Sequence, residues 1–269
     1  MLLLSVYLCR LVLMSKVFLD IGNSFVKWST VDSDFYEFHG SVSLNDIIEN
    51  GLSSVLDIDD KVDSVFFSSV ADKSHVDILK TMIQDEWQLL PHQLTSQQSC
   101  LGLTTGYKDF ASLGDDRWFA MLGAIESFKQ PVIVIDAGTA LTIDAIIDGQ
   151  HQGGFIVPGL YSMRKSLSLA TADLDDYSQA EVPVLEDDRR HLLATDTSSA
   201  ILGGTLYMAA AFVNQIVADL NLQLDTQFKV LLTGGEANKI SSLLDMEFEL
   251  FNDLVLQGMV FVEESIKKA

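Results

Sequence analysis

The sequence predicts an α/β protein built from two similar halves. Strand-like and helix-like hydrophobic patterns alternate along the chain from about residue 16. An apolar strand, an Asp-x-Gly turn and a second strand occur together at Asp20 and again at Asp136. Because apolar strands flank both turns, and the second turn stands near the middle of the 269 residues, we interpret the two units as the starts of two related halves.

The composition fits a folded globule and excludes several classes of protein. Hydrophobic residues make up 48% of the chain and charged residues 20%, which argues against disorder. The formal net charge of −21 works against binding to nucleic acid or to an anionic membrane surface. Cys9 and Cys100 are too few for a disulfide framework, so we expect a cytoplasmic protein.

We expect residues 1–15 to be a leader outside the fold. Residues 1–14 are apolar except for Ser5 and Arg10, but a bilayer span needs about 20 apolar residues. The segment also lacks the basic region and the cleavage site of a signal peptide. We therefore expect translation to start at Met14; an extra packed element and a weak membrane tether are the alternatives.

We expect the first half to span residues 16–130 and the second to span residues 131–269. In the first half, the predicted strands are residues 17–20, 25–31 and 62–70, and the predicted helices are residues 76–84 and 116–128. In the second half, the predicted strands are residues 132–135, 141–147 and 229–232, and the predicted helices are residues 159–171, 197–219 and a stretch from about residue 237. Turns are expected at Gly114–Asp115, before an acidic first helical turn, and at Asp148–Gly149.

Both Asp-x-Gly turns suit a phosphate site. Glycine lets backbone N–H groups approach an anion without a Cβ atom in the way. The neighbouring hydroxyl and amide side chains that can donate to phosphate oxygens are Asn23, Ser24, Thr139 and Thr142. We expect the carboxylates of Asp20 and Asp136 to hold cations rather than to touch phosphate.

Three further features carry chemical signals. Lys27 follows the first turn, where its ammonium group would reach a transferring phosphoryl group; the alternative is a solvated strand lysine. The Thr233-Gly-Gly235 turn is a weak signal alone, but its exposed backbone suits an adenine or a ribose.

Asp116 beside Arg117 is the third feature. The Asp116 carboxylate is a good acceptor for a hydroxyl proton, and Arg117 is a good clamp for an acidic substrate. The alternative is an acid at the end of a helix with a surface ion pair.

Competing motifs are missing from the sequence. The five histidines are scattered and the two cysteines stand apart, so a zinc site is not expected. The sequence contains neither a Walker-type P-loop nor a G-x-G-x-x-G motif after a strand.

The order of two Asp-x-Gly hairpins and a strand-Gly-Gly-helix unit resembles the acetate kinase, sugar kinase, Hsp70 and actin superfamily. In that superfamily two ribonuclease-H-like halves form an inter-domain nucleotide cleft. Within it, the chain resembles the type III pantothenate kinase family. The motifs that carry the resemblance are Asp20-Ile-Gly-Asn-Ser24 with Lys27, Gly106-Tyr107, Leu113-Gly-Asp-Asp-Arg-Trp118, Asp136-Ala-Gly-Thr-Ala-Leu-Thr142, Gly153-Gly-Phe-Ile-Val-Pro-Gly159, Asp196-Thr-Ser-Ser-Ala200 and Thr233-Gly-Gly235.

The resemblance implies ATP-dependent phosphorylation of pantothenate to 4′-phosphopantothenate, the first step of coenzyme A biosynthesis, by direct transfer with Asp116 as general base. The implied nucleotide-binding residues are Asp20, Gly22, Asn23, Ser24, Lys27, Thr139, Gly234 and Gly235. The implied substrate-binding residues are Tyr107, Gly114, Asp115, Arg117 and Thr197. The resemblance further implies Mg²⁺ near Asp20, a monovalent cation (K⁺ or NH₄⁺) at Asp136, and a homodimer that binds neither nucleic acid nor membrane.

Two positions depart from the family pattern, and three alternatives stay open. The family usually has threonine where Ser24 stands and a proline near Phe110, and residues before Met14 have no family counterpart. The alternative functions are a related small-molecule kinase, a non-catalytic regulatory relative and an actin-like filament former. The candidate catalytic groups Asp116, Lys27 and Asp136 favour an enzyme.

Overall fold

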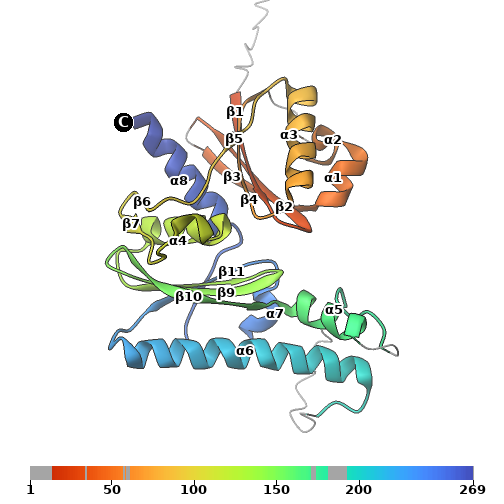
Figure 1. Cartoon of the computed structure of the whole chain (residues 1–269), viewed down its shortest axis with the longest axis vertical. Coiled ribbons are helices and arrows are strands. Elements are labelled where there is room, and N and C mark those ends of the chain that lie inside the picture. Colours follow the sequence, from red (N-terminus) through yellow and green to blue (C-terminus); the bar gives the residue numbers. More distant parts are fainter. Residues whose placement is uncertain are drawn as a thin grey trace, which may run out of the picture. The chain divides into compact units, whose positions relative to one another are not determined.

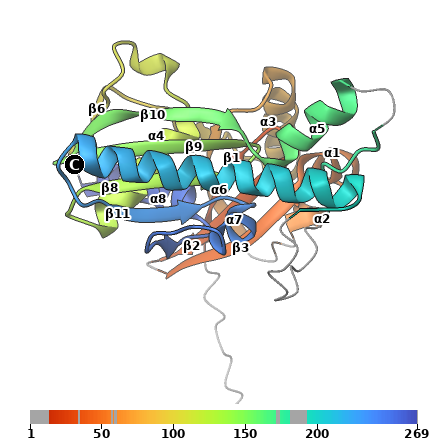
Figure 2. The same ribbon diagram turned by 90° about the horizontal axis from the view of Figure 1, so that it is seen from below.

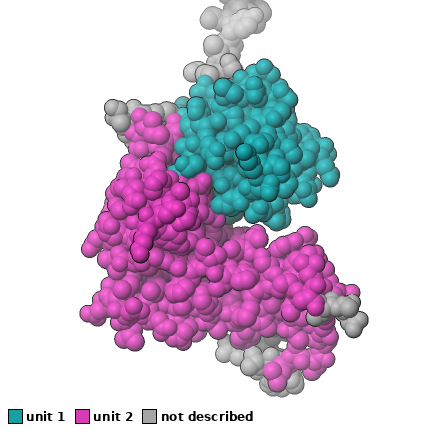
Figure 3. Space-filling view, in the orientation of Figure 1, with its two compact units in different colours: residues 1–95 teal, residues 96–269 magenta. Residues whose placement is uncertain are grey.

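The structure is a computed structural model that describes residues 14–33, 35–56, 58, 61–170, 174–180 and 193–268. Most of the predicted leader therefore lies outside the described residues. The chain divides into two compact units, residues 1–95 and residues 96–269, coloured separately in Figure 3. The boundary predicted near Gln130 separates the two halves of the repeat rather than these compact units, and it stays a prediction.

The first unit is a five-stranded mixed sheet with helices on one face (Figure 1). Its strands are β1 (Met14–Ile21), β2 (Phe25–Asp32), β3 (Phe35–Ser43), β4 (Lys61–Ser69) and β5 (His92–Gln93), in the order β3-β2-β1-β4-β5. Its helices are α1 (Leu44–Asn50), α2 (Leu52–Leu56) and α3 (Lys73–Trp87). Apolar side chains of alternate strand positions, such as Val17, Leu19 and Ile21, pack against these helices to form the core.

The second unit is built on a seven-stranded sheet. Its strands are β6 (Ser99–Cys100), β7 (Leu103–Thr104), β8 (Val132–Ala137), β9 (Ala140–Ile147), β10 (Gln150–Pro158), β11 (Lys229–Thr233) and β12 (Glu249–Leu250), in the order β12-β11-β8-β9-β10-β7-β6. The central strand β8 is almost fully buried, and the run Val132–Ile135 that predicted it is apolar throughout.

The two sheets repeat one topology. Strands β1 to β5 and strands β8 to β12 are arranged in the same order, with the third, second, first, fourth and fifth strand side by side. In each set the first two strands pair antiparallel across the Asp-x-Gly turn, and the fourth strand pairs parallel to the first. This correspondence confirms the predicted α/β class and the predicted pair of ribonuclease-H-like sheets.

Helices cover both faces of the second sheet (Figures 1 and 2). Helices α4 (Asp115–Ser127) and α8 (Leu254–Lys268) pack on each other on one face, and the short helix η1 (Phe110–Ser112) precedes α4. The opposite face carries α5 (Leu160–Ala170), α6 (Thr197–Gln223) and α7 (Ala237–Ser241). Helix α6 is long and apolar enough to cross a membrane by length and composition, a test that core helices of soluble proteins also pass.

The predicted elements are found with shifted bounds. The helix predicted for residues 76–84 begins earlier, at Lys73, because the Asp72 carboxylate accepts the Ser74 N–H and caps the helix. The helix predicted to follow the Gly114–Asp115 turn does so, but α4 is buried on nearly all sides because α8 covers it. The Gly153–Gly159 motif, to which we assigned no secondary structure, forms most of β10.

Candidate active site

The candidate site residues fall into two groups, one in each compact unit. The first group surrounds the turn between β1 and β2. The Gly22 N–H donates to the Phe25 carbonyl oxygen at 2.9 Å and closes the turn, and Asn23 is exposed at its tip. Asp20 and Lys27 are register partners on the two strands, so their side chains lie on the same face of the sheet. Asp20 and Lys27 are therefore cross-strand neighbours near the turn.

The second group contains two glycine turns that lie against each other. Asp136 ends the buried part of β8, and Gly234 follows β11 with a φ of +102°. A Cβ atom added at Gly234 would collide with the Ala137 carbonyl oxygen and with Asp136 Oδ1. By contrast, a Cβ atom at Gly235 would stand in open space. In Thr233-Gly-Gly235, Gly234 therefore occupies a position without room for a side chain, whereas Gly235 has an accessible backbone.

Glu236, which we did not predict from the sequence, connects these turns to helix α5 through hydrogen bonds. Its N–H donates to the Ala137 carbonyl oxygen at 2.8 Å, and its Oε2 accepts the Leu160 N–H at 2.9 Å. A carboxylate at the first turn of α5 is also favoured by the helix dipole. Glu236 thereby fixes the glycine turn after β11 relative to the turn after β8.

Asp116 stands in the first turn of α4 and has the properties of a base. Its side chain is half-buried, and its Oδ1 accepts the Arg117 N–H at 2.7 Å. Burial, and then repulsion from Asp136, raise the pKa of Asp116 to about 6, although the Arg117 N–H and charge act in the opposite direction. Asp116 is therefore ionised near neutral pH, yet it binds a proton far more readily than an exposed aspartate does.

Arg117, the next residue, is buried and hydrogen-bonded to two other side chains. Its Nε donates to Asp144 Oδ2 at 2.8 Å and its Nη2 to Asp144 Oδ1 at 2.5 Å, while Nη1 donates to the Tyr107 hydroxyl at 2.8 Å. Burial works against the charge on Arg117, but these bonds and the attraction of Asp144 outweigh it and raise the pKa. The structure brings Tyr107 and Arg117 together; their contact with substrate stays a prediction.

Asp144 and His151 complete this arrangement and were missed by the sequence analysis. His151 Nε2 lies 2.9 Å from Asp144 Oδ1, and the His151 ring stacks on Tyr107 with centroids 5.7 Å apart. A Cβ atom added at Gly154 would collide with the Ile143 carbonyl oxygen and crowd both Asp144 and Arg117. The only signal for Asp144 was an acid inside the mostly apolar strand β9.

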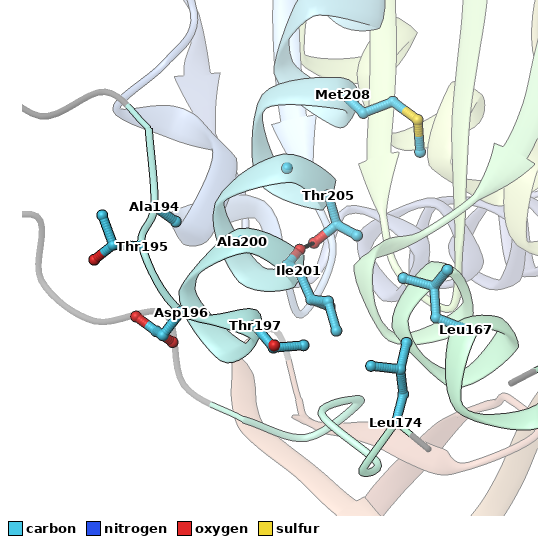
Figure 4. A pocket seen from close by; sticks show the side chains of 11 residues that line it. Leu167, Leu174, Ala194, Thr195, Asp196, Thr197, Ala200, Ile201, Thr205 and Met208 are labelled. Carbon is cyan, nitrogen blue, oxygen red and sulfur yellow. Dashed lines mark hydrogen bonds between the residues drawn. The ribbon is translucent and has the colours of Figure 1, made fainter. Parts of the chain in front are cut away.

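Gly114, Asp115 and Thr197 have distinct positions. Gly114 is the N-cap of α4, and Asp115 Oδ1 accepts the Ser96 N–H at 2.6 Å, with its pKa raised by burial. Thr197 begins α6 and lines a cavity of about 650 Å³ (Figure 4). The cavity lining also includes Leu167, Ile201, Thr205 and Met208, but not Tyr107, Gly114, Asp116 or Arg117. Among the described residues, this cavity lining therefore does not bring Thr197 together with the other predicted substrate-binding residues.

Two carboxylates suit the cations that the sequence analysis expects. The described parts of the chain contain no group of three or more His, Cys, Asp or Glu residues that could hold a metal. A magnesium ion that is held by nucleotide phosphates and water needs only one or two carboxylates, and Asp20 meets this requirement. Asp136 lies against the Gly234 cradle and repels Asp116, so a cation there would relieve the repulsion between the two carboxylates.

Comparison with known proteins identifies the family. The family model described as type III pantothenate kinase matches residues 16–219. A type III pantothenate kinase of Hydrogenovibrio crunogenus is 39% identical over 251 residues, which cover 93% of this chain and 99% of that protein. A type III pantothenate kinase of Nitrosococcus oceani is 32% identical, over 93% of this chain and 94% of the relative.

Solved structures share the fold at low sequence identity. A Campylobacter jejuni protein described as a conserved putative Baf family transcriptional activator has a TM-score of 0.52 and 20% identity, over 94% of this chain and 100% of the other. Component A of the (R)-2-hydroxyglutaryl-CoA dehydratase of Acidaminococcus fermentans has a TM-score of 0.54 and 12% identity, over 93% and 96% of the two chains. These structures show the shared fold alone, whereas the sequence matches over most of its length show that the chain belongs to the type III pantothenate kinase family.

Proposed function

We propose that this chain is a cytoplasmic enzyme that transfers the γ-phosphoryl group of ATP to the primary hydroxyl of pantothenate, giving 4′-phosphopantothenate for coenzyme A biosynthesis. Family membership supports the reaction. The observation that supports the mechanism is a half-buried carboxylate, Asp116, whose pKa is raised to about 6 at the start of a helix.

The proposed chemical step is a direct, in-line transfer. Asp116 accepts the proton of the pantothenate hydroxyl as its oxygen forms a bond to the γ-phosphorus. The bond between the γ-phosphorus and the bridging oxygen breaks, and ADP leaves with that electron pair. A base with a pKa near 6 is ionised at pH 7 and still takes a proton effectively, which suits this role.

The glycine turns are the proposed nucleotide-binding elements. The turn at Gly22, with the side chains of Asn23, Ser24, Lys27 and Thr139, would bind the phosphates, while the Gly22 N–H itself donates to the Phe25 carbonyl oxygen and shapes the turn. Gly234 and Gly235 would face the ribose or the adenine, and the open space beside Gly235 supports this assignment. Lys27 also offers a positive charge in a chain with a net charge of −21.

The proposed cation ligands are Asp20 for Mg²⁺ and Asp136 for K⁺ or NH₄⁺. The chemistry that these ions supply is neutralisation of negative charge on the phosphates and between the carboxylates. On the protein side, Asp20 is the register partner of Lys27, and Asp136 Oδ1 occupies space that a Cβ atom at Gly234 would need.

Tyr107, Gly114, Asp115, Arg117 and Thr197 are the proposed pantothenate-binding residues. Because Arg117 is held by Asp144, we propose that it contributes a fixed positive charge beside Asp116 rather than a mobile clamp. Two of its five N–H donors are left over from its bonds to Asp144 and Tyr107.

We propose a homodimer that uses the outer faces of α6 and β10. Met208 on α6 is 56% exposed and Ile156 on β10 is 61% exposed, and the two elements contact each other through Phe155 and Phe212. A second copy of the chain would cover these apolar side chains. Sedimentation of the purified protein should give twice the chain mass, and Met208→Glu should shift it towards the single-chain mass; a monomeric wild type would contradict the dimer.

A coupled ATP-consumption assay tests the proposed function. We expect turnover that depends on pantothenate in potassium buffer and much less turnover in sodium buffer. Absence of pantothenate-dependent turnover in potassium would contradict the reaction, whereas equal rates in both buffers would contradict only the monovalent-cation site.

A further inference from the structure

Four side chains form a hydrogen-bonded cluster. Two of them, Tyr107 and Arg117, belong to motifs of the predicted site, whereas Asp144 and His151 belong to neither motif. We define the Asp144 cluster as Tyr107, Arg117, Asp144 and His151. We propose that Asp144 and His151 are positioning residues that hold Tyr107 and Arg117 in place and thereby set the affinity of the enzyme for its hydroxyl acceptor. This inference rests on the proposed function.

Three hydrogen bonds, two from Arg117 and one from His151, hold the Asp144 carboxylate in place. Both of its oxygens accept from Arg117, at 2.8 and 2.5 Å, and Oδ1 also lies 2.9 Å from His151 Nε2. An ionised carboxylate only accepts hydrogen bonds, so His151 must donate from Nε2. With the Asp144 and His151 side chains almost completely buried, water does not compete for these bonds.

The second nitrogen of His151 supports this assignment of the proton. His151 Nδ1 is buried and has no hydrogen-bond partner in the described parts of the chain. A buried N–H without an acceptor is costly, so the imidazole carries its proton on Nε2 and leaves Nδ1 as an acceptor. The side chain of glutamine places an N–H near the position of Nε2 and is therefore the closest replacement for this donor.

The cluster holds Tyr107 on a segment that is otherwise open to solvent. Gly106, Lys108, Asp109 and Phe110 are all exposed, whereas Tyr107 is half-buried. Its ring stacks on His151 at 5.7 Å and faces the Arg117 guanidinium at 5.5 Å, and its hydroxyl accepts from Arg117 Nη1 at 2.8 Å. The orientation of the ring therefore depends on His151 and Arg117 more than on neighbours in the chain.

The Asp144 cluster contacts Asp116, the proposed general base, and does not contact the described residues proposed to bind the nucleotide. Arg117 is the neighbour of Asp116, and its backbone N–H donates to Asp116 Oδ1. Within the described residues, the hydrogen bonds and ring contacts of these four side chains do not include the glycine turns at Gly138 or Gly235. A disturbed cluster should consequently raise KM for pantothenate, while KM for ATP and kcat stay close to their wild-type values.

Two substitutions of His151 provide the test, because Asp144→Asn would leave the buried Arg117 charge unpaired and endanger the fold. His151→Phe keeps a ring against Tyr107 and removes the donor to Asp144. His151→Gln keeps a donor and removes the ring. We expect KM for pantothenate to rise about tenfold in His151→Phe and about threefold in His151→Gln, with kcat and KM for ATP within about twofold.

His39→Phe is the matched control, because His39 also combines a ring contact, to Trp28, with a side-chain hydrogen bond, to Thr30. It should leave KM for pantothenate unchanged. The proposal is overturned if His151→Phe leaves that KM unchanged, if it lowers kcat or raises KM for ATP to the same degree, or if His39→Phe has the same effect.

A second measurement does not require turnover and separates this inference from the proposed function. If wild-type protein shows no pantothenate-dependent turnover, the function fails, and the cluster is then tested by urea unfolding of His151→Phe, Tyr107→Leu and the double variant. Coupled residues should give midpoint shifts that do not add, whereas additive shifts would overturn the positioning role of His151.

Discussion

Asp116 is the residue whose environment most directly determines the proposed chemistry. Burial and the neighbouring carboxylates raise its pKa from 3.8 to about 6. Because the general base must be ionised, activity should be full well above pH 6 and should fall about tenfold per pH unit below it. The kcat/KM for pantothenate measured from pH 4.5 to 8.5 checks this; a flat profile down to pH 4.5 would contradict it.

The same shift has a consequence for stability. A carboxyl group whose folded pKa is raised binds a proton more readily in the folded chain than in the unfolded chain. Asp116 therefore costs stability above pH 6, and this cost is relieved as the pH falls from about 6 towards 3.8. Asp116→Asn should accordingly unfold at a higher urea concentration than wild type at pH 7.5, and this advantage should shrink at pH 5; a loss of stability at pH 7.5 would contradict it.

The neighbouring glycines Gly234 and Gly235 differ in the space that each has for a side chain. Gly234 has a φ of +102° and no room for a Cβ atom, whereas Gly235 has open space beside it. Gly234→Ala should reduce the free energy of unfolding by about 1–3 kcal/mol or more, and Gly235→Ala should change it little. Urea unfolding of both variants checks this, and equal losses would contradict the assigned geometry.

At the scale of elements, the Arg117–Asp144 pair joins helix α4 to strand β9. Both side chains are buried, with 4% and 2% exposed. Asp144→Leu should destabilise the protein by about 3–5 kcal/mol, because it leaves a buried guanidinium without its partner. The double variant Arg117→Leu, Asp144→Leu should recover part of that loss. As a control, Asp176→Asn, in an exposed pair with Lys165, should have little effect; similar losses in both pairs would contradict the account.

The elements also show what the sequence can and cannot predict. The two Asp-x-Gly turns and the start of α4 at Gly114 were predictable, because turn chemistry and apolar runs are local signals. The pairing of Arg117 with Asp144 and His151 was not, because it depends on the register between β9 and β10 and on where α4 packs. Strand β3, whose residues alternate between exposed and half-buried, was missed since none of its side chains is fully buried.

At the scale of the whole molecule, the repeated strand order explains why two Asp-x-Gly turns exist at all. Each turn joins the first two strands of one sheet, so a duplicated sheet carries a duplicated turn. The second sheet differs by its two extra edge strands, β6 and β7, which lead towards Tyr107. Tyr107, one of the proposed pantothenate-binding residues, therefore follows two strands that the shared five-strand order does not include.

The net charge of −21 should weaken the binding of anionic substrates at low ionic strength. ATP and pantothenate are both anions, and an acidic surface repels them over about one Debye length. At constant potassium and magnesium, raising the ionic strength with an inert salt from about 0.02 to about 0.3 M should therefore lower KM for both substrates. Steady-state kinetics across this range check it, and a rise in KM for both substrates would contradict it.

The most direct test of the central claim compares Asp116→Asn with wild type in the pantothenate-dependent reaction. Asparagine keeps the shape of the side chain and removes its ability to accept a proton. We predict that kcat falls by about 10²–10⁴-fold while the urea midpoint does not fall, and that the exposed-helix control Asp85→Asn keeps wild-type kcat. A near-wild-type kcat in Asp116→Asn would contradict the assignment of Asp116 as general base.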